Sequence, residues 1–512
     1  MIALDAAEPR LVERWMKDGT LPNLNRLCTR GCYGRLKSTA DCLAGSPWPT
    51  FYTGKPPAHH GLYHSLQWRA DQMRLVPPSP DWLPLRLFWR DLSETGYRVV
   101  AVDMPMTYAP EAFNGVEISG WASHDRLMPP ASYPPSTLRW IHRQFGVQPF
   151  APEECRLERK NSLFMLRDHL IQSTSHVADL VKELMGREAW DLFLVAFGAT
   201  HRGGHKLWGL SGIIGKTRSE DRVELSHALQ DVYVACDLAV ARIVKEAGDG
   251  VTTLIFSLHG MGPNTSRAHL MPTMLARILG REKIHTKRLE QDPRDHLLRL
   301  RGYLPPEWRD RVSRLLPLSL QRKLTTFQHP EHQFDGIDWN LTSAFSLVAD
   351  LQGYIRINLR GREVAGIVEP GKEYDQLCEA IKEGFGTFVD AHTGNPIVKS
   401  VVRSDKLFAA GCRLDCLPDL IVLWSSSPAA NHRVITSAQF GNIRWATPGL
   451  NPDGRSGNHR PEGFLLAAGR QIKPHSRIDD AHILDLAPTV YALLNLNKPA
   501  KFCGNVLSEI AS

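Results

Sequence analysis

The sequence lacks a long apolar run: no stretch approaches the roughly 18 residues that a helix needs to cross a bilayer. The opening segment MIALDAAEPR has no basic region followed by an apolar one, so it does not resemble a secretory signal. Cysteine is sparse, with nine in 512 residues and no CxxC pair, which argues against a disulfide framework and a zinc ribbon. These absences predict a cytoplasmic protein without a membrane partner.

Strong charge of one sign is also lacking. The formal net charge of +7 is small for this length and dispersed along the chain, so we predict no nucleic-acid polymer as a partner. A mildly basic field favours small anionic substrates. There is no internal repeat or low-complexity segment, and 43% apolar with 22% charged residues is the composition of a globular protein. The sequence does not indicate the oligomeric state.

What the chain does contain is a series of short apolar runs that end in polar residues or glycine. Such continuous runs are typical of strands buried on both faces of a parallel sheet. Helical patterns lie between them, for example at residues 21–31 and 223–248. The alternation predicts an α/β fold with a doubly wound, mostly parallel sheet and helices on both faces. The expected strands are residues 1–4 (MIAL), 97–104 (YRVVAVDM), 190–198 (WDLFLVAFG), 251–260 (VTTLIFSLHG) and 418–424 (PDLIVLW).

The middle of the chain breaks this alternation. Residues 295–324 carry basic and apolar residues at helical spacing, which predicts an inserted helical segment. The alternation in YIRINL (354–359) predicts a half-exposed strand of a small α+β lobe. We therefore expect a core that resumes at PDLIVLW and ends in a helix over 483–496. The predicted division is a first core part over 1–270, an inserted cap over 271–414 and a second core part over 415–512.

Metal-competent side chains recur at the ends of these runs. Asp5 follows the first run, His201 and His205 follow the third, and His259 follows the fourth. His459 lies in a glycine-flanked loop before another apolar stretch. Ligands of α/β sheets bind at the carboxyl ends of the strands, and imidazole with carboxylate suits Zn²⁺. A single histidine of this kind is more often structural than a ligand, but the common placement of these four predicts a metal site.

The segment SPWPTFYTGKPPAHHGLY (46–63) offers a candidate nucleophile. A hydroxyl just before a helix lies in the field of the helix N-terminus, which favours a developing oxyanion. Ser46 has this position, although it could be a plain N-cap, whereas Thr50 would lie inside the helix. His59 and His60 follow this helix and could contact substrate or lie at the surface.

Several long segments, in order, resemble the type I phosphodiesterase/nucleotide pyrophosphatase family of the alkaline phosphatase superfamily. The opening segment from LDAAEP to GRLKST resembles the start of that family, with its metal-binding Asp. WPTFYTGKPPAHHGLY resembles its nucleophile helix, and LIFSLHGMG its S-D-H-G-M motif. GNHRPEGFLLAAG resembles its late G-x-H motif, and ILDLAPTVYALLNL the C-terminal helix of bacterial members.

The resemblance implies two metal ions, commonly zinc, that hold a phosphoryl group during in-line displacement. It implies His201, His205 and His459 at one ion, and Asp5 with His259 at the other. The chain departs from the family pattern at three points. His201 stands where the family has Asp, Leu258 stands where the second site has Asp, and a gapless count places Ala44 rather than Ser46 at the nucleophile. The second ion is therefore doubtful.

The sequence thus predicts a metal-dependent hydrolase of phosphate esters, with phosphodiesters or nucleotide-like molecules as substrates. The attacking group would be Ser46 or a metal-bound hydroxide, and Arg202 with Lys206 would meet the phosphate. The alternatives are a degenerate member that binds anions or regulates without turnover, and a phosphomutase. A sulfatase is disfavoured because the Cys-x-Pro-Ser-Arg signature is missing around Cys42.

Overall fold

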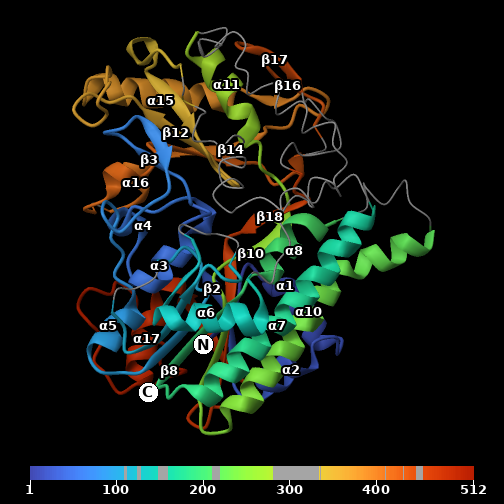
Figure 1. Cartoon of the computed structure of the whole chain (residues 1–512). Coiled ribbons are helices and arrows are strands. Elements are labelled where there is room, and N and C mark those ends of the chain that lie inside the picture. Colours follow the sequence, from blue (N-terminus) through green and yellow to red (C-terminus); the bar gives the residue numbers. More distant parts are fainter. Residues whose placement is uncertain are drawn as a thin grey trace.

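The computed structural model describes residues 1–108, 112–123, 129–147, 160–209, 219–280, 334, 336–409, 411–429, 432–444 and 454–511. The helical segment predicted at 295–324 lies outside these residues. Figure 1 shows a large sheet with helices packed around it and a smaller lobe above it.

The main sheet has nine strands in the order β20-β2-β19-β9-β1-β8-β5-β6-β7. The central strands are parallel, and β19 and β7 run antiparallel to their neighbours. The prediction of a mostly parallel α/β sheet is therefore confirmed. In sheet order the strands span Ser476–His482, Cys32–Lys37, Glu462–Ala468, Thr253–Ser257, Ile2–Leu4, Leu192–Phe197, Val99–Val102, Gly115–Ser119 and Ala131–Tyr133.

Helices cover both faces of this sheet, because successive side chains of each strand point to opposite sides. On β1, Ile2 and Leu4 pack into one apolar layer and Ala3 into the other. The first layer is closed by α1 (Pro9–Lys17), α2 (Pro22–Thr29), α7 (Lys160–Arg187) and α10 (Ser219–Ala247). The second is closed by α3 (Pro47–Thr53), α5 (Phe88–Glu94) and α17 (Leu486–Leu493). Burial on both faces explains the unbroken apolar runs of the sequence.

The smaller lobe is built on a four-stranded sheet in the order β11-β12-β15-β14. These strands span Ala344–Leu347, Gly353–Ile357, Leu420–Trp424 and Val398–Arg403. The run PDLIVLW is therefore not where the main sheet resumes: it forms β15, which pairs antiparallel with β12 and β14. An apolar run shows that a strand is buried but not in which sheet it lies.

The expectation for YIRINL was also wrong. All five residues of β12 are buried, because both faces of its sheet are covered. Ile355 packs against a cluster that includes α11 (Met271–Ile278) and α15 (Lys372–Gly386), while Tyr354 packs against an aromatic cluster that includes Trp68 of the β3–β4 hairpin. Alternation in a sequence reports the two faces of a strand, but it does not show whether the polar side meets water or another layer.

The remaining elements connect these layers. Short helices occur at α4 (Pro57–His60), α6 (Pro135–Phe145), α8 (Ala199–Leu207) and α16 (Ser404–Leu407), and 3₁₀ turns at Thr39–Asp41, Ala268–Leu270, Trp339–Leu341, Leu414–Cys416 and Ile483–Asp485. The small sheets comprise β3 (Gln67–Arg69) with β4 (Arg74–Val76), β10 (Gly260–Pro263) with β18 (Gly457–Arg460), and β13 (Val389–Asp390) with β16 (Val434–Ser437) and β17 (Gly441–Arg444). Figure 1 places α8, β10 and β18 between the main sheet and the lobe.

Candidate metal and substrate site

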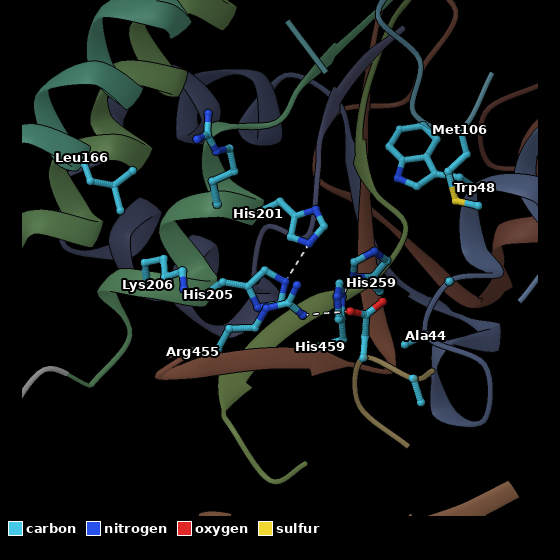
Figure 2. A pocket seen from close by; sticks show the side chains of 14 residues that line it. Ala44, Trp48, Met106, Leu166, His201, His205, Lys206, His259, Arg455 and His459 are labelled. Atoms are coloured by element: carbon cyan, nitrogen blue, oxygen red, sulfur yellow. Dashed lines mark hydrogen bonds and ion pairs between the residues drawn. The ribbon is translucent and has the colours of Figure 1, made fainter. Parts of the chain in front are cut away.

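His201 and His205 lie on one face of α8, the helix that directly follows β8. Residues four apart in a helix are neighbours on its surface, so the spacing in THRGGH directs both rings into the same space. Their Nε2 atoms are 2.9 Å apart, and both side chains are buried. Figure 2 shows the two imidazoles side by side next to α8.

Two glycines allow the paired strands β10 and β18 to pack directly against α8. A Cβ on Gly457 would lie 2.1 Å from the carbonyl oxygen of Gly204, and a Cβ on Gly204 would lie 2.6 Å from Cγ of Met261. Both distances are far below van der Waals contact, so a larger residue would push the strand away. Glycine inside a helix costs about 1 kcal/mol relative to alanine. The close approach that it permits places His459 beside the α8 pair.

His459 completes a group of three imidazoles. Its ring centroid is 4.9 Å from that of His201 and 5.0 Å from that of His205. One nitrogen from each of the three rings lies within 4.8 Å of the other two. Within the described residues, this is the group of three or more histidine, cysteine or acidic side chains that could hold a metal ion.

The outer nitrogens of the α8 pair meet acceptors. Nδ1 of His201 lies 2.8 Å from the Asp5 carboxylate, and Nδ1 of His205 lies 3.0 Å from the carbonyl oxygen of Gly457. A carbonyl and an ionised carboxylate can only accept hydrogen bonds, so each Nδ1 carries the proton. With these protons on Nδ1, the two Nε2 atoms face each other as acceptors. Such a contact needs a cation or a further proton between the two atoms.

The surroundings of His205 and His459 disfavour a further proton on these two rings. Burial lowers the pKa of His205 well below its ordinary value, and the nearby Arg455 guanidinium lowers it further. Burial also lowers the pKa of His459, as does the neighbouring His259. Neutral imidazoles with their outer nitrogens held by acceptors are the usual state of histidine ligands. The donor set therefore fits a divalent ion that prefers nitrogen, such as zinc.

Asp5 lies where β1 ends, at the carboxyl edge of the main sheet. Its backbone N–H donates to the carbonyl of Phe197 in β8, and the next residue, Ala6, has a φ of 53°. This left-handed turn is unfavourable for a residue other than glycine and fixes the direction of the Asp5 side chain. One carboxylate oxygen accepts the 2.9 Å hydrogen bond of the Trp48 indole, and the other lies next to His201.

His259 lies at the end of β9 and contacts both Asp5 and His459. Its Nδ1 is 3.1 Å from Nδ1 of His459, and its Nε2 is 3.9 Å from the Asp5 carboxylate. The preceding residue, Leu258, is buried in the apolar layer that contains Phe256. The structure thus brings all five predicted ligands together at one edge of the sheet, with an apolar residue next to the second pair.

Ser46 is not brought to this cluster. Its side chain is completely buried, and its hydroxyl donates a 2.7 Å hydrogen bond to the carbonyl of Leu43 and lies 2.6 Å from the Thr39 hydroxyl. Ala44 and Gly45, rather than Ser46, line the adjacent cavity. His60, after the same helix, is also buried and bonds to Thr50 at 3.0 Å, outside the cavity.

A cavity of about 360 Å³ opens beside the three imidazoles. Arg202 and Lys206 line it, and so do two charged residues that the sequence did not point to, Asp350 and Arg455. Apolar side chains form the rest of its wall (Figure 2). These apolar lining residues are Ala44, Trp48, Met106, Leu166 and Ala349.

Asp350 reaches the cavity from the β11–β12 turn of the smaller lobe. Its carboxylate lies 2.9 Å from Arg455 and 3.4 Å from Nε2 of His64. Burial raises the pKa of this carboxyl. His64 and Arg455 lower the pKa by more than burial raises it, so it lies well below its ordinary value. No motif could have shown this residue, because its role depends on how the lobe sits on the main sheet.

Within the described part of the chain, no helix is both long and apolar enough to span a bilayer.

A search of curated proteins found no match. Among solved structures, phosphonoacetate hydrolase from Sinorhizobium meliloti 1021 with phosphonoformate is 13% identical over 95% of this chain and 93% of its own, with a TM-score of 0.48. Murine ectonucleotide pyrophosphatase/phosphodiesterase 5 with AMP is 12% identical over 97% and 95%, with a TM-score of 0.45.

The sequence itself settles the family. The family model described as type I phosphodiesterase / nucleotide pyrophosphatase matches residues 1–423, most of the chain. The segments of the resemblance that contain Asp5, His259 and His459 lie at the edge of the main sheet where the imidazoles meet. This chain therefore belongs to the type I phosphodiesterase / nucleotide pyrophosphatase family of phosphoric ester hydrolases.

Proposed function

We propose that this chain is a metal-dependent hydrolase of small phosphodiesters or nucleotide-like phosphoesters, and that His201, His205 and His459 hold its ion. The observation that carries this proposal is the pair of Nε2 atoms 2.9 Å apart whose outer nitrogens both face acceptors. Zinc is the ion that we favour, because three imidazoles with room for a further ligand are a common arrangement of catalytic zinc. When bound, the ion would neutralise charge on a phosphoryl oxygen and lower the pKa of water.

The cavity supports an anionic substrate with an organic substituent. Arg202, Lys206 and Arg455 place positive charge around it, against the single lining carboxylate of Asp350. The guanidinium of Arg455 is held by this carboxylate at 2.9 Å, which limits the directions in which it can point. Arginine in such a position suits phosphate oxygens. The apolar wall with Trp48 suits the organic groups of a diester better than a bare phosphate.

We infer that water, rather than Ser46, is the attacking group. The Ser46 hydroxyl already donates to Leu43, and the cavity wall at this point is Ala44. Water would form the new P–O bond while the bond to the leaving alcohol breaks, which yields a phosphomonoester and an alcohol. The side chains around the cavity bind and orient the ester for this in-line displacement.

Turnover of chromogenic esters tests this function. Zinc-loaded protein should release nitrophenol from bis(4-nitrophenyl) phosphate faster than from 4-nitrophenyl phosphate. A chelator should abolish the release, and added zinc should restore it. His205→Ala should lose activity, whereas His227→Ala, which changes an exposed histidine of α10, should keep it. If zinc-loaded protein cleaves neither ester, the hydrolase proposal is wrong.

The same preparation separates a hydrolase from a degenerate family member that only binds anions. A binding protein would show saturable heat of binding for inorganic phosphate or AMP, without release of nitrophenol from either ester. A phosphomutase would transfer the phosphoryl group within its substrate and release no phosphate. Product analysis by ³¹P NMR distinguishes the three outcomes.

A further inference from the structure

We propose that Asp5 and His259 are not ligands of a second ion but outer partners that orient His201 and His459, so that the site holds a single ion. This inference rests on the metal centre of the proposed function and specifies its composition. Each of the three ligand rings then has one outer partner. These partners are Asp5 for His201, the Gly457 carbonyl for His205 and His259 for His459.

The hydrogen bonds of Asp5 support this role. The carboxylate is 1% exposed, and each of its oxygens has a donor in the structure: the Trp48 indole at 2.9 Å and Nδ1 of His201 at 2.8 Å. A ligand oxygen of a second ion would have to give up one of these bonds. Carboxylate partners of this kind fix the tautomer of a ligand histidine and raise its basicity.

The proton on His259 follows from the same reasoning. Nε2 of His259 faces the Asp5 carboxylate at 3.9 Å, which favours the proton on that nitrogen. Nδ1 of His259 is then a lone pair that accepts from Nδ1 of His459, 3.1 Å away. Nε2 of His459 is thereby left without a proton, as a ligand nitrogen requires. All outer protons point toward Asp5, His259 or Gly457, and the bare nitrogens point inward.

The charge around the second pair also disfavours another ion. Two divalent ions held about 4 Å apart repel each other and need anionic ligands between and around them. Here Asp5 is the carboxylate of the cluster, and Leu258 lies in the apolar layer next to His259. An ion between Asp5 and His259 would meet a carboxylate whose two oxygens already accept hydrogen bonds and an imidazole that already contacts His459.

Metal stoichiometry tests the inference directly. The full chain, stripped with a chelator and titrated with Zn²⁺ or Co²⁺, should bind one ion by calorimetry and by elemental analysis. Binding of two ions of comparable affinity would overturn the inference, whether or not the protein hydrolyses esters. One ion without turnover would instead contradict the proposed function and leave the inference standing.

Two variants test the role of Asp5. Asp5→Asn should weaken binding of the single ion by roughly 10- to 100-fold, the usual effect of losing an outer partner, without changing the stoichiometry. The matched control is Asp237→Asn, a buried carboxylate that accepts from the backbone of Leu24 far from the cavity, and it should keep full affinity. If Asp5→Asn binds as tightly as this control, Asp5 is not a positioning residue.

Trp48→Phe provides a second test that does not remove a charge. It frees one oxygen of Asp5 but leaves Leu258 in place, so the variant should still bind one ion. A second ion in Trp48→Phe would show that the indole bond alone keeps Asp5 from binding another ion, which overturns the argument from charge and Leu258 but leaves the unchanged protein with a single ion.

Histidine tautomers give a readout that a purely structural role would not move. In zinc-loaded protein labelled with ¹⁵N-histidine, we expect Nδ1–H with a coordinated Nε2 for the three ligand rings and Nε2–H for His259. The opposite tautomer of His259, with Nδ1–H toward the Gly260 carbonyl 3.5 Å away, would put a proton on Nε2 of His459. That spectrum would contradict the assignment.

Discussion

Two buried polar networks in this chain contain the same residue types but differ in how their donors and acceptors match. In the histidine cluster at the main sheet, Nε2 atoms of His201 and His205 face each other as two acceptors. In the second network, Arg267 donates to His432 at 2.5 Å and His432 donates to Asp390 at 2.6 Å. The first network is incomplete without a cation, whereas in the second each histidine nitrogen faces a complementary donor or acceptor.

The second network shows what a structural arrangement looks like. Arg267 is completely buried and also donates to the carbonyls of Thr265, Ser425 and Ser427, although its Nε has no hydrogen-bond partner. Burial lowers the pKa of Arg267 to about 10, so it remains charged at neutral pH. The comparison teaches that the direction of the protons, rather than the presence of histidine and carboxylate, distinguishes a ligand site from a structural network.

The largest expected difference is between His205→Ala and His432→Ala. His205→Ala should lose the ion and reduce hydrolysis to background, while the unfolding free energy of the metal-free protein changes little. His432→Ala should keep its metal stoichiometry but lose about 1–3 kcal/mol of stability, because buried donors of Arg267 and acceptors of Asp390 lose their partner. Metal analysis and chemical denaturation check both. Loss of the ion in His432→Ala alone would contradict the comparison.

Substitution of Arg455 should affect substrate binding, whereas substitution of Arg267 should affect stability. Arg455→Gln should raise the KM for a phosphodiester about 10- to 100-fold, the effect of losing a charged hydrogen bond of about 1.5–3 kcal/mol. It should leave the unfolding transition nearly unchanged, since Arg455 is partly exposed. Arg267→Gln should instead destabilise the protein and leave the KM of the folded fraction unaltered. Steady-state kinetics beside thermal unfolding distinguish the two, and an unchanged KM in Arg455→Gln would remove Arg455 from the substrate site.

Ser46→Ala should change turnover less than Arg455→Gln changes the KM or Arg267→Gln changes the stability. The variant loses a buried hydrogen bond to Leu43, worth about 1 kcal/mol of stability. We expect kcat to stay within about tenfold of the unchanged protein, because acid–base or nucleophilic roles are worth at least 100-fold. Single-turnover kinetics check this. A loss of several orders of magnitude with the ion still bound would restore Ser46 as the nucleophile.

The smallest effect concerns the pH dependence of stability. Burial lowers the pKa of His432 below its ordinary value, and the charge of the neighbouring Arg267 lowers it as well. The hydrogen bond with Asp390 opposes this shift. Below about pH 6.5 the unfolded chain therefore takes up a proton before the folded one, and stability falls as pH falls, by up to about 1.4 kcal/mol per pH unit. The Asp390 carboxyl, whose pKa is about 2, does not titrate in this window.

His432→Asn isolates this contribution, because asparagine has no titratable group. The variant should be less stable at pH 8 but should lose less stability than the unchanged protein between pH 6.5 and 4.5. Urea denaturation at each pH measures the two slopes. Parallel slopes would show that His432 does not titrate differently in the folded and unfolded states.

Much of the site could be predicted because it lies at strand ends. Asp5, His201 and His259 each follow an apolar run, and the parallel register of β1, β8 and β9 brings these ends to one edge. The strand of residues 418–424 was assigned to the wrong sheet for a related reason. Its apolar pattern shows burial, but pairing with β12 depends on the partner strand and not on its own residues.

The family, the mostly parallel sheet and the histidines at its edge follow from the residues alone, because periodicity and motif spacing are local properties of the chain. The folded chain is needed to show that Trp48 donates to Asp5, that Asp350 of the lobe holds Arg455 and that Ser46 turns away from the cavity. These features depend on hydrogen-bond directions between segments that meet only after packing.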